Sequence, residues 1–70
     1  MTPYDIYRHW EQGLYYIAPE LVDEKLLRTK RAIWAVEEIF DAGPNTEAGA
    51  EAVEVLRMMR EFEKELRLSR

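Results

Sequence analysis

The sequence predicts an all-α protein in which a short N-terminal helix is followed by a long antiparallel helical hairpin. Two long stretches carry apolar side chains at alternating spacings of three and four residues, which is the period of one helix face. Between them stands Gly43-Pro44, a pair of residues that ends helices. With 70 residues the chain is long enough for one domain, so residues 1–70 are expected to form a single helical unit.

The first helix is expected over residues 3–17. Thr2 supplies a hydroxyl N-cap, Pro3 suits the first helical position, and Asp5 completes a variant of the capping box. Four apolar residues then recur at helical spacing: Ile6, Trp10, Leu14 and Ile17. Gly13 lies within this stretch, where it costs about 1 kcal/mol relative to alanine.

The second helix is expected over residues 19–42 and the third over residues 46–68. Pro19 disfavours helical geometry at the residue before it, so the chain should turn there and start the second helix on the proline itself. A continuous bent helix is the alternative. Asn45 or Thr46 would cap the third helix. A connection of about four residues between two long helices makes them antiparallel.

The two long helices carry matched apolar faces, which we call the inner faces. Apolar or small residues follow the spacing 4, 3, 4, 3, 4 in both helices. The two sets are Val22, Leu26, Thr29, Ile33, Val36 and Phe40, and Ala48, Ala52, Val55, Met59, Phe62 and Leu66. Folding the chain back at Gly43 sets Phe40 near Ala48 and Val36 near Ala52. Large side chains then oppose small ones, as in coiled-coil packing.

Further apolar side chains of the second helix lie outside its inner face. Leu27 and Trp34 sit roughly 100 to 120° around the helix from it, and Ile39 extends the apolar arc on the other side. A first helix of about 15 residues covers only part of such a hairpin. We therefore expect a homodimer in which two hairpins form a four-helix bundle through Leu27, Trp34 and Ile39. The alternative is a monomer whose first helix closes a three-helix bundle over Trp34.

Composition and charge narrow the class of protein. The absence of cysteine excludes disulfides and thiolate metal sites, which leaves oligomerisation as the usual support for so small a domain and fits a cytoplasmic location. No apolar run approaches the roughly 20 residues that span a bilayer, and Asp5 and Arg8 interrupt the region where a signal peptide would be apolar. The net charge of −4 favours a protein partner with a basic or mixed surface over nucleic acid or membrane.

Charged residues of the third helix lie on the two flanks of its inner face, with acids on one flank and basic residues on the other. One flank, the acidic ridge, comprises Glu47, Glu51, Glu54, Glu61 and Glu65, with Met58 among them. Two of its like-charge pairs stand four residues apart, which costs a few tenths of a kcal/mol each. The functional interpretation is a docking surface for a basic partner, with Met58 as an adaptable apolar contact. The alternative is an ordinary solvated helix face.

The first helix carries more aromatic residues than one apolar stripe uses. Tyr4 and Tyr15 are predicted to lie near the side opposite that stripe, beside Arg8 and Glu11. Exposed tyrosines near arginine are favoured in protein interfaces because they bury much area at little entropic cost. We therefore count Tyr4 and Tyr15 as candidate partner-binding residues, or else as contacts to a dimer mate.

Catalytic and metal-binding patterns are weak. His9 follows Asp5 by one helical turn, but no nucleophile, oxyanion hole or glycine-rich loop accompanies it, so a local hydrogen bond between the two is the expected role. Carboxylates one turn apart are found at Glu20 and Asp23, Glu38 and Asp41, and Glu51 and Glu54. A small metal-dependent hydrolase is therefore an alternative, but we expect no enzyme and no cofactor. The basic residues Arg28, Lys30 and Arg31 are too dispersed around their helix for a nucleic-acid site.

In size, acidity, freedom from cysteine and hairpin plan, the chain resembles the small helical proteins with which temperate phages inhibit host regulators, including the anti-quorum-sensing inhibitors of Pseudomonas phages. Such proteins occupy a partner's DNA-binding or assembly surface, often as dimers. The resemblance implies a protein-binding inhibitor of a host regulatory or motor protein, acting by occlusion. The alternative within the binding class is a structural or assembly subunit that oligomerises with itself.

Overall fold

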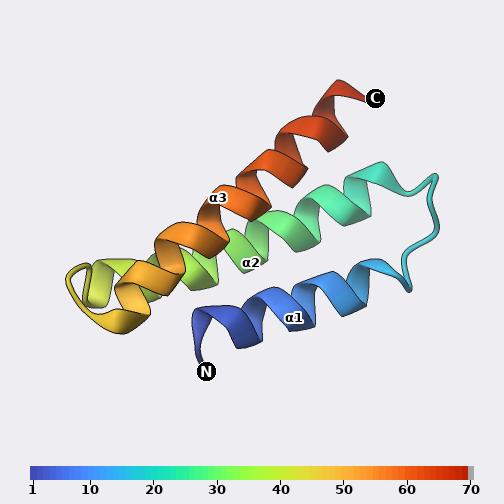
Figure 1. Ribbon diagram of the computed structural model, residues 1–70. Helices are drawn as coiled ribbons and strands as arrows, with labels where there is room; N and C mark the ends of the chain where they lie inside the picture. The colour runs from blue at the N-terminus through green and yellow to red at the C-terminus, as the bar shows by residue number, and fades with distance from the viewer. Residues whose placement is uncertain (70) are drawn as a thin grey trace.

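The computed structural model describes residues 1–69, which form three helices and no strand. They are α1 (Pro3–Leu14), α2 (Val22–Ala42) and α3 (Glu47–Leu68) (Figure 1). The predicted all-α class is confirmed. Within the described residues, none of these helices is both long and apolar enough to span a bilayer.

The start of α1 is fixed by the capping box that the sequence predicts. The Thr2 hydroxyl accepts a hydrogen bond from the Asp5 amide at 3.1 Å, and the Asp5 carboxylate accepts one from the Thr2 amide at 3.1 Å. The end of α1 differs from the prediction, because the helix stops at Leu14 rather than at residue 17. The amides of the next three residues bond to carbonyls only three residues back, so the last turn tightens and the α-helical ladder ends.

The start of α2 also differs from the prediction, since the helix begins at Val22 and not at Pro19. The Leu21 amide donates to the Ala18 carbonyl at 3.0 Å and closes a turn around the proline. The first amide of the α2 ladder is that of Lys25, bonded to the Leu21 carbonyl at 3.2 Å. Pro19 therefore sits in a connecting turn.

The connection between α2 and α3 is short and closely packed. The Thr46 hydroxyl accepts from the Gly49 amide at 3.0 Å and donates to the Gly43 carbonyl at 2.6 Å, so α3 begins one residue later than predicted, at Glu47. Gly49 is buried, and a Cβ atom there would run into the backbone carbonyls of Gly43 and Pro44. Only glycine allows this close approach.

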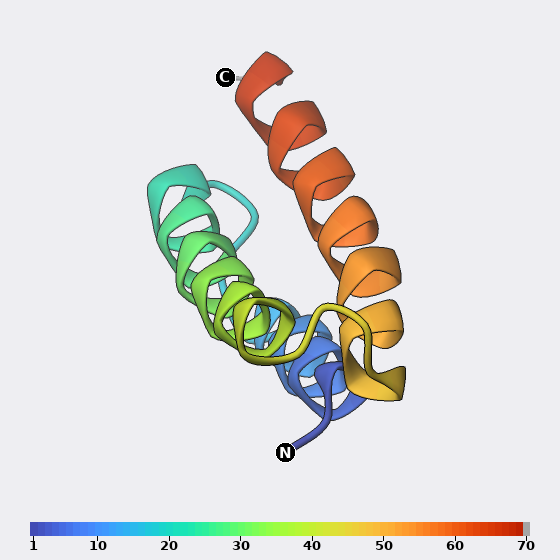
Figure 2. The same cartoon turned by 90° about the vertical axis from the view of Figure 1, so that its left-hand side faces the viewer.

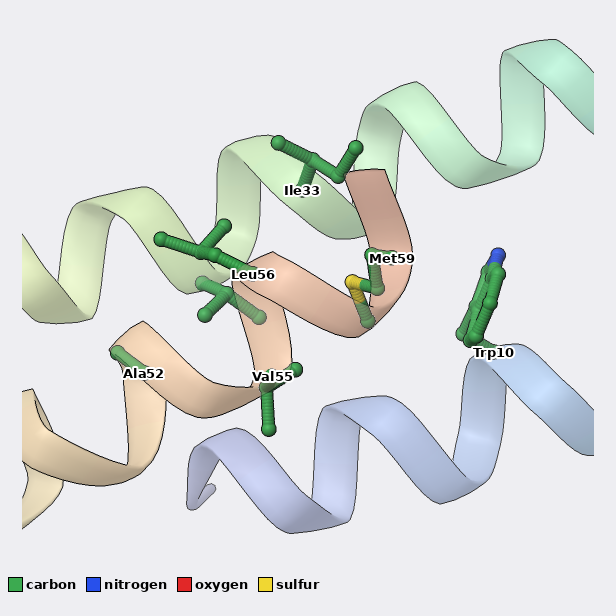
Figure 3. Packing of buried hydrophobic residues seen from close by; sticks show 7 residues of the cluster. Trp10, Ile33, Ala52, Val55, Leu56 and Met59 are labelled. Carbon is green, nitrogen blue, oxygen red and sulfur yellow. The ribbon is translucent and has the colours of Figure 1, made fainter. Parts of the chain in front are cut away.

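The core is formed by all three helices (Figure 3). Of the predicted inner faces, Thr29, Ile33 and Val36 of α2 and Ala52, Val55 and Met59 of α3 are buried. Leu56 is also buried, at 7% exposure, although it lies outside the predicted face of α3. Trp10 of α1 completes the cluster at 5% exposure, so α1 belongs to the same core as the two long helices.

Trp10 fastens α1 to both long helices. Its indole Nε1 donates to the Thr29 hydroxyl at 3.0 Å, and that hydroxyl donates in turn to the Lys25 carbonyl at 2.8 Å. Its ring meets Phe62 edge-on, with centroids 5.1 Å apart. Figure 2 shows α2 and α3 separating from the loop that joins them toward the end of α3. Trp10 takes up space at that wider end.

A second attachment joins α1 to α2 through Arg28. Its guanidinium donates to the carbonyls of His9 at 2.9 Å and Trp10 at 3.3 Å, near the C-terminal end of α1, where a cation complements the helix dipole. The guanidinium lies where a Cβ atom of residue 13 would stand. Gly13 therefore leaves room for this contact.

Candidate functional site: a groove between α1 and α3

The main candidate site is a groove of about 730 Å³ between α1 and the C-terminal half of α3. Its floor is buried or half-buried and consists of Tyr7, Trp10, Leu14, Met58 and Phe62. Its rim is polar and consists of Glu11, Tyr15, Lys25, Arg57, Glu61 and Glu65. Helical periodicity explains both sets, because residues three, four or seven apart share one helix side. The groove therefore combines an apolar floor with a charged rim.

Aromatic rings hold the floor of the groove in place. Tyr7 and Trp10 pack with ring centroids 5.5 Å apart, and Trp10 is itself fixed against Phe62 and by its hydrogen bond to Thr29. The Tyr7 hydroxyl donates to the Glu11 carboxylate at 3.3 Å. Burial, and then the nearby Glu11 carboxylate, raise the pKa of Tyr7 above its usual value. The floor is thus a preorganised aromatic surface.

The rim carries three carboxylates, Glu11, Glu61 and Glu65, against two cations, Lys25 and Arg57. Two of these acids belong to the predicted acidic ridge, and Tyr15 on the same rim is 83% exposed. The structure therefore brings a predicted partner-binding tyrosine at the C-terminal cap of α1 and predicted partner-binding acids of α3 to one groove.

The N-terminal half of the acidic ridge lies against α1. The Tyr4 hydroxyl donates to the Glu54 carboxylate at 2.7 Å, and this hydrogen bond, more than burial, raises the pKa of Tyr4. Glu51 is half-buried, and its buried Oε1 has no hydrogen-bond partner among the described residues. Met58 packs against the core cluster. Glu47 is exposed at the start of α3. Glu61 and Glu65, at the C-terminal end of the ridge, are therefore the two of its acids that border the groove.

Sequence reasoning did not place α1 on the acidic flank of α3. Tyr4 and Tyr15 are exposed, as expected for residues away from the apolar stripe, but Tyr4 also reaches Glu54 and Tyr15 borders the groove. The missed floor residues were Tyr7, Trp10, Leu14 and Phe62. The sequence did contain a signal for the side of α1 that borders α3. Tyr4, Glu11 and Tyr15 lie on one side of the helix, at spacings of seven and four residues.

The three residues predicted to form a dimer interface do not share one surface. Trp34 is 56% and Leu27 45% exposed, whereas Ile39 is half-buried. Ile39 follows Trp34 by five residues, which places it about 140° away around α2. In the alternative, the first helix closes a three-helix bundle over Trp34. α1 does pack against both long helices of its own chain, but it does so through Trp10 and leaves Trp34 exposed, so the coverage of Trp34 was predicted wrongly.

Asp5 and His9 of α1 do not form the pair that the sequence predicts. The Asp5 carboxylate bonds to the Thr2 amide and pairs with Arg8 at 2.6 Å, and the expected hydrogen bond to His9 is not found. These two contacts, the Thr2 amide first, lower the pKa of Asp5 to about 2. Residues 1–69 contain no cluster of three or more histidine, aspartate or glutamate side chains that could hold a metal ion.

A scan against protein-family models and searches of curated proteins and of solved structures found no match to this chain.

Proposed function

We propose that this chain is a protein-binding module that docks a basic, amphipathic segment of a host regulatory or motor protein and inhibits that protein by occluding a functional surface. The observation that carries the proposal is the groove between α1 and α3, with its aromatic floor and its excess of carboxylates on the rim. A helix with one apolar and one basic face matches both features.

The chemistry of the groove suits such a segment. Tyr7 and Phe62 are half-buried and offer rigid rings, which contribute most strongly to binding when they lie at the centre of an interface, while the buried Trp10 supports them from beneath. Met58 supplies an adaptable apolar contact beside them. Glu61 and Glu65 at the rim would attract arginine and lysine side chains and speed the encounter with a basic partner.

Inhibition follows if the docked segment is one that the partner needs. A basic, amphipathic helix is the kind of element that regulators insert into DNA, and the acidic chain would compete with phosphates for it. This mechanism agrees with the resemblance to phage inhibitors of host regulators in the cytoplasm. It requires no catalysis and no cofactor.

The partner is best identified by affinity capture from a bacterial lysate, in which the wild type is compared with a variant altered in the groove and a variant altered elsewhere. The groove variant is Glu61→Lys/Glu65→Lys, and the matched control is Glu20→Lys/Glu24→Lys, which changes net charge equally at exposed residues outside both the groove and the acidic ridge. Both variants must keep the wild-type circular dichroism spectrum. We expect a protein retained by the wild type and the control and lost from the groove variant. Equal retention by both variants would rule out the groove as the binding site.

Inhibition itself needs a separate measurement. The captured protein is purified and its own activity, such as DNA binding, is titrated with this chain. We expect activity to fall to background near one equivalent, with no loss for the groove variant. A partner that binds but keeps full activity would contradict inhibition by occlusion and favour an adaptor.

We also propose that the chain associates with itself, as the predicted dimeric four-helix bundle requires. The supporting observation is the exposure of two apolar side chains on the same side of α2. Trp34 is more than half exposed, and Leu27, seven residues before it, is exposed as well. Sedimentation of the purified protein over a hundredfold range of concentration tests this. A monomer throughout would exclude it, and species larger than a dimer would favour an assembly subunit.

A further inference from the structure

One face of α2, which we call the outer face, is turned away from the core. It comprises Leu27, Lys30, Arg31, Trp34, Glu38 and Asp41, all of which are exposed. Leu27, Lys30, Trp34, Glu38 and Asp41 follow one another at spacings of three and four, and Arg31 stands four after Leu27 and three before Trp34, so the six form one stripe along the helix. A large apolar ring at 56% exposure lies in the middle of this stripe, at Trp34.

Charge is ordered along the outer face in a way that depends on Trp34. The two basic residues, Lys30 and Arg31, precede the tryptophan, and the two acids, Glu38 and Asp41, follow it. Lys30 stands four residues before Trp34 and Glu38 four residues after it. Reversing the direction of the helix about Trp34 therefore exchanges these two positions.

We propose that the outer face of α2 binds the same face of a second copy of this chain, with the two helices antiparallel and Trp34 at the two-fold axis. Lys30 of each copy then faces Glu38 of the other, so the contact contains two equivalent ion pairs around a central pair of indole rings. An isologous interface requires this kind of self-complementary surface. A parallel arrangement would set Lys30 against Lys30 and Glu38 against Glu38.

Three observations point to a second copy as the occupant. Lys30 and Glu38 are exposed, and no ion pair or hydrogen bond within residues 1–69 involves the side chain of either, so both are available. Trp34, at 56% exposure, supplies apolar area midway between these two charges. The opposite charges lie at equal distances on either side of it, which a surface for an unrelated partner does not need.

The inference rests on the proposed self-association and not on the groove, because the outer face contains none of the groove residues. It can be tested by exchanging the charges. Lys30→Glu and Glu38→Lys each replace two attractive pairs with two repulsive ones, and the double variant Lys30→Glu/Glu38→Lys restores attraction with the signs reversed. Sedimentation equilibrium at low salt is the measurement, since exposed pairs are screened by salt.

We expect each single variant to raise the dimer dissociation constant by about tenfold, from the usual strength of exposed ion pairs. The double variant should return to within about threefold of the wild type. A wild type that stays monomeric would exclude self-association itself. A dimer that the single variants leave unchanged would keep self-association but overturn the antiparallel contact.

Cross-linking gives a second, independent readout, because the chain contains no cysteine. Lys30→Cys and Glu38→Cys proteins are mixed and oxidised. We expect the mixed disulfide in preference to either homodimer, since antiparallel α2 helices set identical positions eight residues, or about 12 Å, apart along the axis. Preferential formation of the two homodimers would show a parallel contact and overturn the inference.

Discussion

The two ends of the molecule are packed differently. At the closed end, near the loop of residues 43–46, Val36, Ala52 and Val55 are fully buried and Gly49 touches the backbone of the loop. At the open end, Phe62 and Leu66 are only half-buried, and Leu68 is 77% exposed. The closed end therefore holds the helices together, whereas the open end leaves apolar surface for a partner.

The cause of this difference is the size of the residues between α2 and α3. Ala48, Gly49 and Ala52 let the helices approach closely at the closed end. At the open end Trp10 of α1 bonds to Thr29 and contacts Phe62, so it occupies the space between the long helices. The groove lies beside this tryptophan, which links the wider packing to the proposed function.

The largest expected difference between the two ends comes from one substitution made at both, Leu56→Ala and Leu66→Ala. Leu56 is 7% exposed at the closed end, so its truncation should cost about 3 kcal/mol of unfolding free energy. Leu66 is half-buried, so its truncation should cost about 1 kcal/mol. Urea unfolding followed by circular dichroism measures both. Equal losses would mean that the ends contribute equally to stability.

Glycine at the closed end should be less replaceable than glycine at the open end. Gly49→Ala places a methyl group against fixed backbone and should cost about 2 kcal/mol. Gly13→Ala displaces only the mobile end of Arg28, and the gain of about 1 kcal/mol in helix propensity offsets part of the lost contact. Thermal unfolding of both variants tests this. A Gly49→Ala protein as stable as the wild type would show that the loop can shift.

The hydrogen bond of Trp10 to Thr29 should stabilise the packing at the open end. Thr29→Val leaves the buried indole N–H without an acceptor and should cost about 1.5 kcal/mol, while Thr29→Ser keeps the hydroxyl and should cost less. Tryptophan fluorescence and denaturant unfolding provide the measurements. If valine leaves the stability unchanged and serine lowers it, the methyl group matters and the hydrogen bond does not.

The smallest expected effect is a pH dependence at the start of α1. The pKa of Asp5 is lowered to about 2, so its contribution to stability is present above about pH 4 and is lost as the pH falls toward 2. Asp5→Asn should therefore be less stable than the wild type at neutral pH, and the two should converge near pH 2. Thermal unfolding at pH 7, 4 and 2 is the measurement. A constant difference across this range would exclude the carboxylate as the cause.

Much of the fold follows from the sequence because it is local. The capping box at Thr2 and Asp5, the break at Gly43 and the periodic inner faces each depend on residues within one or two helical turns of one another. The same local rules failed between Leu14 and Val22, where the turn around Pro19 had several possible geometries. The candidate acids and tyrosines were also readable, since unusual charge and aromatic content are properties of the sequence.

By itself, the sequence determined that this chain forms three amphipathic helices and which side of each helix is apolar. Only the tertiary structure decided that α1 covers the acidic flank of α3, buries Trp10 instead of Trp34, and leaves the end of the acidic ridge beside an aromatic groove. The physical reason is that helical periodicity shows which side of a helix is apolar but not which other helix packs against that side. The packing contact depends on complementary shape, which here is the space for one indole ring between Thr29 and Phe62.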